Sequence, residues 1–258
     1  SAVQFRPEPQ TRKSSMQKIS LYFCLISCTL FSQQKTYFQQ EVNYEIDVVL
    51  NDNEHTLSAY EKIEYKNNSS DELSFLWFHI WPNAYKNDST AYAKQAGPSS
   101  RFVKSDSSDR GFIDSLDFKV DGKKIDWSYH PEWIDVVKLN LDNTLKPNQT
   151  ITIETPFFVK LPGEVFSRLG HTGKHYEITQ WYPKPAVYDK KGWHPMPYLN
   201  QGEFYSEFGT FNVKITLPRD YKVMATGDLV NGESEYLWLE GLTSKTDSLN
   251  SLSEKELK

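Results

Sequence analysis

Apolar and polar side chains alternate along the chain from Tyr37 onward, and this period of two residues restricts the fold more than any other feature. The first such stretch has its apolar positions at Val42, Tyr44, Ile46 and Val48. Residues two apart lie on the same face of a β-strand, whereas a helix repeats about every 3.6 residues. The pattern therefore predicts strands that each bury one face.

Similar stretches recur at short intervals, separated by polar turn residues. Leu116 to Trp127 holds two alternating runs around Asp121-Gly122, which is typical of a hairpin with a primed turn. Leu73 to Trp81 is apolar on both faces and predicts a central strand covered on each side. About ten short strands at this spacing indicate an all-β fold, a large antiparallel β-sandwich. The other expected strands are 57–65, 136–141, 150–159, 211–217 and 221–226.

Two segments lack the alternation. Residues 86–111 are polar, small and interrupted by Gly and Pro, which predicts a long loop with a short helical turn near Tyr92. Loops of this length in compact domains tend to be functional or disordered. Residues 233–258 are rich in Ser, Lys, Glu and Leu, and we expect a linker that leads from a β domain over 37–232 towards another domain.

The most apolar stretch is Ile19 to Phe31, which contains both cysteines. It follows a short basic start at Met16 and precedes small or polar residues, the order of a secretory signal peptide over residues 16–33. The stretch is 13 residues long, too short to span a bilayer. A buried core segment is the alternative interpretation. An export signal predicts a periplasmic, cell-surface or secreted protein.

Two details of this end stay open. Residues 1–15 precede the expected start methionine, and we interpret them as a mis-called start or an artificial extension. Leu25 to Cys28 also fits a bacterial lipoprotein cleavage box, which would leave Cys28 as a lipid anchor and as the chain's contact with the membrane.

The charge balance excludes one class of partner. The 258 residues include 29 Lys and Arg against 34 Asp and Glu, which gives a net charge of −5. A protein that binds phosphate backbones needs an excess of basic side chains. Nucleic acid is therefore not an expected partner.

Sequence patterns for catalysis are missing. The chain has no Gly-rich phosphate loop, no GxSxG elbow and no HExxH string. His171 and His175 have the spacing of a helical zinc pair, but Gly173 between them favours an exposed loop. His79 lies on an apolar strand and is expected to be a core histidine. No catalytic or metal-binding residue is predicted in this chain.

The segment from Thr179 to Gly209 collects eight aromatic residues among four prolines. The prolines fix a stiff path, and the rings between them resemble those enriched at interfaces. The segment is either a loop that covers the core with its rings or a docking surface. Three residues are the candidates for stacking or interface contacts, namely Trp181, Tyr188 and Trp193.

Four strings of this sequence resemble the amino-terminal β domain of the zinc aminopeptidases related to aminopeptidase N, the gluzincin family, and most of all its bacterial exported branch. The matching strings, which follow in the family's order, are LWFHIWPNAY at 76–85, TQWYPKPAVYD at 179–189, YSEFGTFNVKITLP at 205–218 and VMATG at 223–227. The resemblance implies a saddle-shaped β domain followed by a thermolysin-like catalytic domain that binds zinc through HExxH and a downstream Glu.

In that family the β domain also lends the active site a Gln-x-Glu pair, whose carboxylate binds the free amino group of a peptide substrate. Gln180 matches the Gln, but Tyr182 stands at the Glu position, which leaves strict aminopeptidase specificity in doubt. Glu203 and Glu177 are the candidates to replace that carboxylate, because they are near in sequence.

Two functions follow as hypotheses. The first is a non-catalytic domain of an exported zinc metallopeptidase, with the missing catalytic domain and a peptide substrate as partners and zinc only in the full-length parent. The second is a free-standing exported β-sandwich module that binds carbohydrate or protein through its aromatic residues. A lipid-anchored surface protein with a structural role is a third interpretation, which depends on Cys28.

Overall fold

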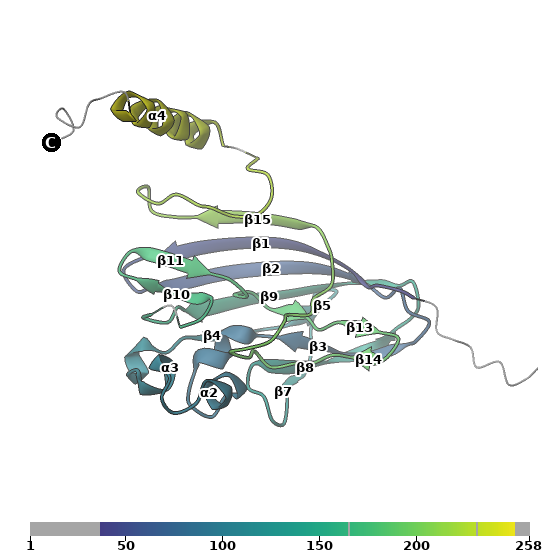
Figure 1. Ribbon diagram of the computed structural model, residues 1–258. Coiled ribbons are helices and arrows are strands. Elements are labelled where there is room, and N and C mark those ends of the chain that lie inside the picture. Colours follow the sequence, from purple (N-terminus) through teal and green to yellow (C-terminus); the bar gives the residue numbers. More distant parts are fainter. Residues whose placement is uncertain (1–36, 165, 231, 251–258) are drawn as a thin grey trace, which may run out of the picture.

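The computed structural model describes residues 37–164, 166–230 and 232–250 (Figure 1). The predicted extension over 1–15, the signal peptide over 16–33 and the proposed anchor Cys28 lie outside the described residues. Two sheets pack against each other, and the long strands of the larger one curve over the smaller one (Figure 1). The predicted all-β fold is confirmed.

The larger sheet has seven strands in the order β15-β1-β2-β9-β5-β6, with β4 also paired to β9. Antiparallel pairing joins all neighbours except β1 and β15, which are parallel. Its strands are β1 (Glu41–Asn51), β2 (Thr56–Lys66), β4 (Phe112–Asp114), β5 (Lys119–Val120), β6 (Lys123–Lys124), β9 (Thr150–Lys160) and β15 (Phe211–Thr216).

The smaller sheet has the order β12-β3-β8-β7. Its strands are β3 (Leu73–His79), β7 (Trp127–Tyr129), β8 (Val136–Leu145) and β12 (Lys184–Pro185). β3 lies between two neighbours, as its doubly apolar sequence predicts, and it ends before the 3-10 helix η2 (Trp81–Tyr85). Two separate hairpins are formed by β10 (Leu169–Thr172) with β11 (His175–Ile178) and by β13 (Tyr188–Asp189) with β14 (Gly192–Trp193).

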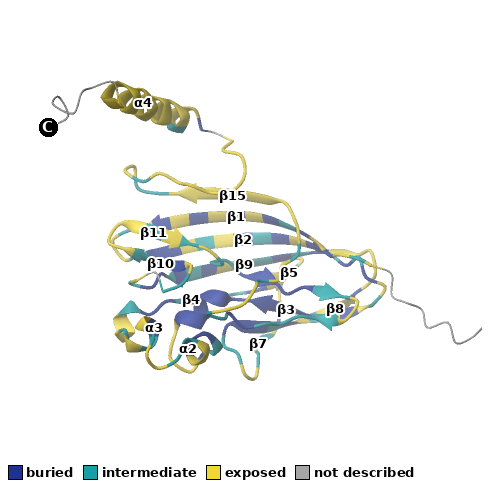
Figure 2. Cartoon of the chain, in the orientation of Figure 1, coloured by how far each residue is buried: buried dark blue, intermediate teal, exposed yellow. Residues whose placement is uncertain are grey.

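The core lies between the two sheets. Buried and exposed residues alternate along β1 (Figure 2), which places every second side chain in the core. On the facing sheet Phe78 packs edge-on against Phe118 at 5.5 Å between ring centroids. Each fully buried side chain of this size stabilises the fold by about 1.5–3 kcal/mol relative to an exposed one.

Three local predictions differ from the structure. The Asp121-Gly122 turn forms with the positive φ angles of a primed turn, 49° and 76°, but its strands β5 and β6 have only two residues each. Residues 221–226 form no strand. No neighbouring strand pairs with these residues in the described part of the chain, and a strand needs such a partner for its backbone N–H and C=O groups. β15 joins β1 in parallel, so the sandwich is not purely antiparallel.

The predicted long loop 86–111 is an ordered unit of short helices. Its elements are α2 (Ala91–Ala96), α3 (Arg101–Lys104) and the 3-10 helix η3 (Ser107–Asp109), and α2 is the helical turn expected near Tyr92. Thr90 accepts a hydrogen bond from the Ala93 N–H, and Ser100 accepts one from the Val103 N–H. These side chains cap the first turns of α2 and α3.

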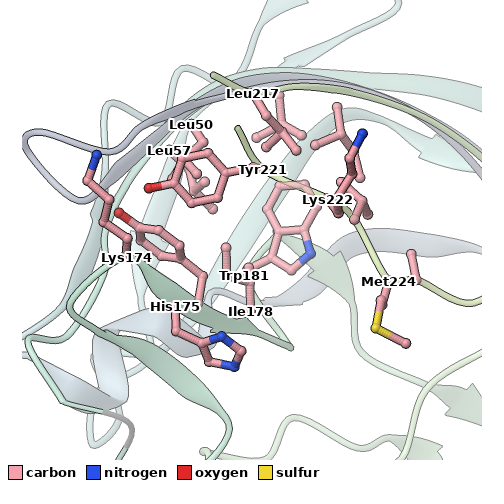
Figure 3. Close-up of a pocket in the computed structure, with 15 residues that line it drawn as sticks. Leu50, Leu57, Lys174, His175, Ile178, Trp181, Leu217, Tyr221, Lys222 and Met224 are labelled. Atoms are coloured by element: carbon pink, nitrogen blue, oxygen red, sulfur yellow. The ribbon is translucent and has the colours of Figure 1, made fainter. Parts of the chain in front are cut away.

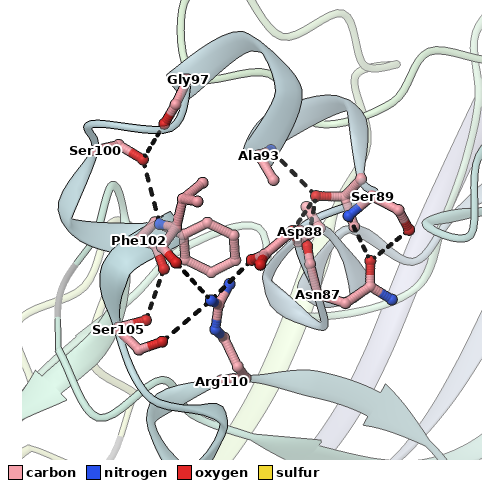
Figure 4. Close-up of polar contacts among 12 residues, drawn as sticks. Asn87, Asp88, Ser89, Ala93, Gly97, Ser100, Phe102, Ser105 and Arg110 are labelled. Carbon is pink, nitrogen blue, oxygen red and sulfur yellow. Dashed lines mark hydrogen bonds and ion pairs between the residues drawn. The ribbon is translucent and has the colours of Figure 1, made fainter.

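One buried arginine holds this unit together (Figure 4). The Arg110 guanidinium lies 2.8 Å from the Asp88 carboxylate and donates to the backbone oxygens of Val103 and Ser105. Its carbon lies 4.1 Å from the centroid of the Phe102 ring. Arg110 therefore ties α3 and the turn before α2 to the chain that leads into β4.

The segment expected as a linker begins with α4 (Glu233–Asn250), a helix with no buried residue. It lies beyond the edge strand β15 (Figure 1). Among the described residues, no helix combines the length and the apolar character that a bilayer span requires.

We expect Arg110→Ala to lower the free energy of unfolding by about 2–3 kcal/mol, because it removes the ion pair and leaves two backbone carbonyls without their donor. Urea unfolding followed by tryptophan fluorescence measures this. The matched control is Lys104→Ala, an exposed cation on α3, which should change the value by less than about 0.5 kcal/mol. Equal losses in both variants would contradict the role of Arg110.

Candidate functional site

The segment that carries the resemblance, Thr179 to Asp189, forms the edge of the smaller sheet. Through β12, Lys184 pairs with His79 and Pro185 with Phe78, and the Ala186 N–H donates to the Trp77 oxygen at 2.8 Å. A proline is tolerated at a sheet edge because its missing N–H faces away from the ladder. The alternating prolines thus place Gln180 and Tyr182 just outside the sheet.

Gln180 has a strained backbone. Its φ angle is +55°, a region that residues other than glycine, asparagine and aspartate rarely occupy. Its side-chain oxygen accepts a hydrogen bond from the Lys184 ammonium. Such strain persists only where the surroundings fix it, and it is frequent at functional sites. Gln180 is therefore held in one orientation with its amide oxygen already engaged.

Lys184 is a buried cation, with 4% of the residue exposed. Its Nζ lies 4.1 Å from the centroid of the Trp81 ring, and no acidic side chain among the described residues lies within ion-pair distance of it. Burial lowers the pKa of Lys184 to about 7. The Trp81 ring, the Tyr182 ring at 5.7 Å and one amide are thus its partners in place of a carboxylate.

His79 packs beside this lysine. The imidazole is fully buried and stacks on Trp81 at 4.5 Å, which confirms the expected core histidine. Its Nε2 accepts a hydrogen bond from the Met196 N–H at 3.2 Å, while its buried Nδ1 has no partner. Burial, and then the charge of Lys184, lower the pKa of His79 to about 3, so it is neutral at pH 7.

Tyr182, at the position of the family's Glu, is half-buried among rings. Its ring centroid lies 5.6 Å from that of Tyr44 and 5.9 Å from that of Phe211, both in edge-on contact. Burial, and then the nearby carboxylate of Glu61, raise the pKa of Tyr182 to about 12. This phenol is therefore neutral at pH 7 and offers no charge to an ammonium group.

Glu61 is the acidic residue that the structure brings to Tyr182, and the sequence interpretation missed it. It lies on β2 with no exposed surface, and both of its carboxylate oxygens lack a hydrogen-bond partner. Burial raises the pKa of Glu61 well above its usual value. The signal was present, because Glu61 occupies an inward position between Ala59 and Ile63, where a charged side chain is unexpected.

The other predicted site residues are dispersed. Glu177 and Glu203 are both exposed, Glu177 on β11 and Glu203 after Tyr198. Tyr188 and Trp193 face each other across the β13–β14 hairpin at 4.9 Å, whereas Trp181 packs against Phe157 at 5.9 Å. The three candidate stacking residues therefore do not form a single platform.

His171 and His175 lie on the two strands of the β10–β11 hairpin, with Gly173 in the turn between them. His171 stacks on His55 at 3.6 Å, while His175 is exposed. Within the described ranges, no three His, Cys, Asp or Glu side chains group as metal ligands.

Two solved structures illustrate what this chain is similar to. The M1 zinc metallopeptidase of Deinococcus radiodurans bound to a Tyr-Ser-Ala substrate is 15% identical over 78% of this chain and 38% of its own, with a TM-score of 0.38. Native leukotriene A4 hydrolase of Saccharomyces cerevisiae is 15% identical over 50% of this chain and 17% of its own, with a TM-score of 0.26.

At these identities the similarity describes the fold alone. The chain spans about two fifths of the length of the Deinococcus radiodurans structure. No model of a protein family and no curated protein matches the chain.

The buried lysine predicts a pH dependence. In the folded chain Lys184 loses its proton near pH 7, whereas in the unfolded chain it keeps it up to its usual 10.5. The unfolded state therefore binds more protons between these values, and the free energy of unfolding rises with pH across that window. Lys184→Met should remove this part of the rise, and it should stabilise the chain most at pH 7 and below, where the folded chain carries the buried charge.

Urea unfolding between pH about 7 and about 9.5 tests this expectation. Lys190→Met, at an exposed lysine, is the control, and its free energy of unfolding should rise with pH as steeply as that of the original chain. An unchanged slope in Lys184→Met would show that this lysine stays protonated in the folded chain.

Glu61 gives a second prediction, in which the free energy of unfolding changes with pH in the opposite direction. We expect Glu61→Leu to raise the free energy of unfolding by about 1–3 kcal/mol, because a buried carboxyl without partners is replaced by an apolar group. Since the raised pKa makes folding take up a proton above the usual 4.5, the gain should grow as the pH rises from there.

Thermal or urea unfolding at acidic and neutral pH measures this gain. The control is Glu64→Leu, an outward position on the same strand, for which no such gain is expected. A loss of stability in Glu61→Leu would mean that its carboxyl has a partner in solution.

Proposed function

We propose that this chain is the amino-terminal, non-catalytic domain of an exported zinc-dependent peptidase, where it forms one wall of the substrate cleft and docks on the catalytic domain. The four matching strings and their order support this proposal. The described residues do not fit a zinc site, because they contain no group of three metal ligands. The zinc, which activates the attacking water in such enzymes, would therefore belong to the catalytic domain.

One observation carries the proposal: the residue at the substrate-binding position adjoins an exposed apolar surface. Tyr182 contacts Phe211, the first residue of β15. Phe211, Val213 and Ile215 alternate along this edge strand and are 49%, 38% and 41% exposed. Contiguous apolar surface of this kind marks an interaction site in soluble proteins.

This surface continues beyond β15. Met224 and Val230 are almost fully exposed, and α4 exposes a further set of large apolar side chains, Tyr236, Leu237, Trp238, Leu239, Leu242 and Leu249. The catalytic domain would bury this surface and so complete a cleft that passes Gln180 and Tyr182.

The substrate follows from the same residues. A peptide's free amino group is a cation at neutral pH and needs a carboxylate partner. At the matching pair, Tyr182 is neutral and the Gln180 oxygen is already bonded to Lys184. The proposed peptidase would therefore hold that amino group through another acidic residue, for which exposed Glu177 and Glu203 are the candidates, or would accept peptides without it.

Export is the remaining part of the proposal. It rests on the basic start, apolar run and small residues of 16–33, and lipid attachment at Cys28 is an added option. Cell fractionation tests the location, and labelling with a palmitate analogue, compared with Cys28→Ser, tests the anchor.

A binding module for carbohydrate is the second candidate. Two contacts favour it, since Trp193 lies against both Tyr188 at 4.9 Å and Phe75 at 6.1 Å between ring centroids, which groups three partly exposed, mutually tilted rings. Sugar rings stack on exposed aromatic side chains. Glycan-array binding that is lost in Trp193→Ala and kept in Trp181→Ala would favour this candidate over the first.

The main proposal is tested at the gene locus and with purified protein. We expect the native gene, or its neighbour, to encode a segment with HExxH, and this segment to form a stable complex with the chain. The complex should hydrolyse peptides in a zinc-dependent manner, whereas the chain alone should not. Val213→Asp, which places a charge on the exposed face of β15, should weaken the complex.

Lys119→Asp, an exposed position on β5, is the control and should leave the complex intact. A locus that encodes no HExxH segment, or hydrolysis by the chain alone, would overturn the proposal. In the active complex, Glu177→Gln and Glu203→Gln together should raise KM for substrates with a free amino group if these residues hold it.

A further inference from the structure

A cleft of about 430 Å³ lies at the end of the larger sheet (Figure 3). Val48 and Leu50 of β1, Leu57 of β2 and the end of β15 form one wall. The β10–β11 hairpin and Trp181, three residues after it, form another, and residues 221–225 complete the lining. The volume falls in the range of about 300–1,000 Å³ that holds small organic ligands.

Apolar side chains make up the interior of this cleft. Leu50, Leu57 and Ile178 surround the Trp181 indole, and Leu217 lies on the side of β15 (Figure 3). The Trp181 N–H has no hydrogen-bond partner within the described part of the chain. A ligand for this space needs an apolar portion of several carbon atoms.

The polar side chains that line the cleft are basic residues and hydrogen-bond donors. They are the ammonium groups of Lys174 and Lys222, the imidazole of His175, the indole N–H and two tyrosine hydroxyls, and no carboxylate is among the fifteen lining residues. Cations and N–H donors without a carboxylate favour an anionic ligand over a cationic one.

The two lysines differ in how firmly they are held. Lys222 lies 2.6 Å from the Glu235 carboxylate and 4.9 Å from the Trp238 ring centroid. Lys174 lies 3.4 Å from Asp52, and its side chain is 78% exposed. The Tyr221 hydroxyl donates to the same Asp52 oxygen at 2.9 Å, so Asp52 keeps a donor when Lys174 turns away. Lys174 is therefore the cation available to a ligand.

We propose that this cleft binds a small amphipathic carboxylate, such as a medium-chain fatty acid, with its apolar chain against Trp181 and its carboxylate beside Lys174 and His175. The cleft uses neither Gln180 nor Tyr182, but it shares Ile215 and Met224 with the docking surface of the proposed function. Ligand binding is measured on the chain alone and docking on the complex, so the failure of one proposal can be told from the failure of the other.

Displacement of a fluorescent probe from the 258-residue chain tests the site. Dansyl-labelled undecanoic acid is bound first, and dodecanoate and dodecanol are then compared as competitors. We expect dodecanoate to compete at a single site. Lys174→Glu should weaken the binding of dodecanoate by about tenfold through charge repulsion and leave the binding of dodecanol unchanged. Lys119→Glu, an exposed lysine outside the lining, is the matched control and should behave like the original chain.

Three results would overturn the proposal that this cleft binds a carboxylate ligand. The first is no displaceable binding of the probe up to its solubility limit. The second is an equal loss in Lys174→Glu and Lys119→Glu, which would mean that net charge alone acts. The third is an equal loss of dodecanoate and dodecanol in Lys174→Glu, which would mean that the carboxylate is not recognised.

Discussion

The pairing of β1, β2 and β9 governs how the other elements are placed. These strands have eleven residues each, and β2 pairs along its whole length with both neighbours. Because side chains alternate strictly along a strand, this register fixes which side chains enter the core. It buries Ile63 and Tyr65, and it also carries Glu61 inward to Tyr182. One ladder thus determines both the core and the environment of the candidate site.

The candidate site places polar groups where they cost stability. Lys184 is buried against an aromatic ring, His79 has one unpartnered nitrogen, and Glu61 has no partner at all. Lys184 still donates to Gln180, but native proteins pair most buried polar atoms, so the unpartnered atoms of His79 on β3 and Glu61 on β2 are exceptions. Together with the positive φ of Gln180, they set this segment apart from the outer strands. This is the pattern expected where function, rather than stability, selects the side chains.

The sequence predicted what depends on local pattern. Alternation located β1, β2, β8 and β9, and Asp121-Gly122 located a turn, because side-chain period and turn chemistry are local properties. The parallel pairing of β15 with β1 and the packing of the short helices within 86–111 were not predictable in this way. Both depend on contacts between residues far apart in sequence, such as that of Arg110 with Asp88 and Phe102. Alternation places Glu61 in a strand, but its position beside Tyr182 depends on a segment more than a hundred residues away in sequence.

We propose that the exposed face of β15, together with the chain up to residue 225, is part of a docking surface for a catalytic domain. Hydrogen–deuterium exchange of the chain, alone and with the HExxH-containing domain from its own locus, tests this directly. We expect residues 208–225 to exchange rapidly in the chain alone and to become protected in the complex, while β2 and β9 are protected in both. Unchanged exchange over 208–225, or new protection confined to β3 and β8, would contradict it.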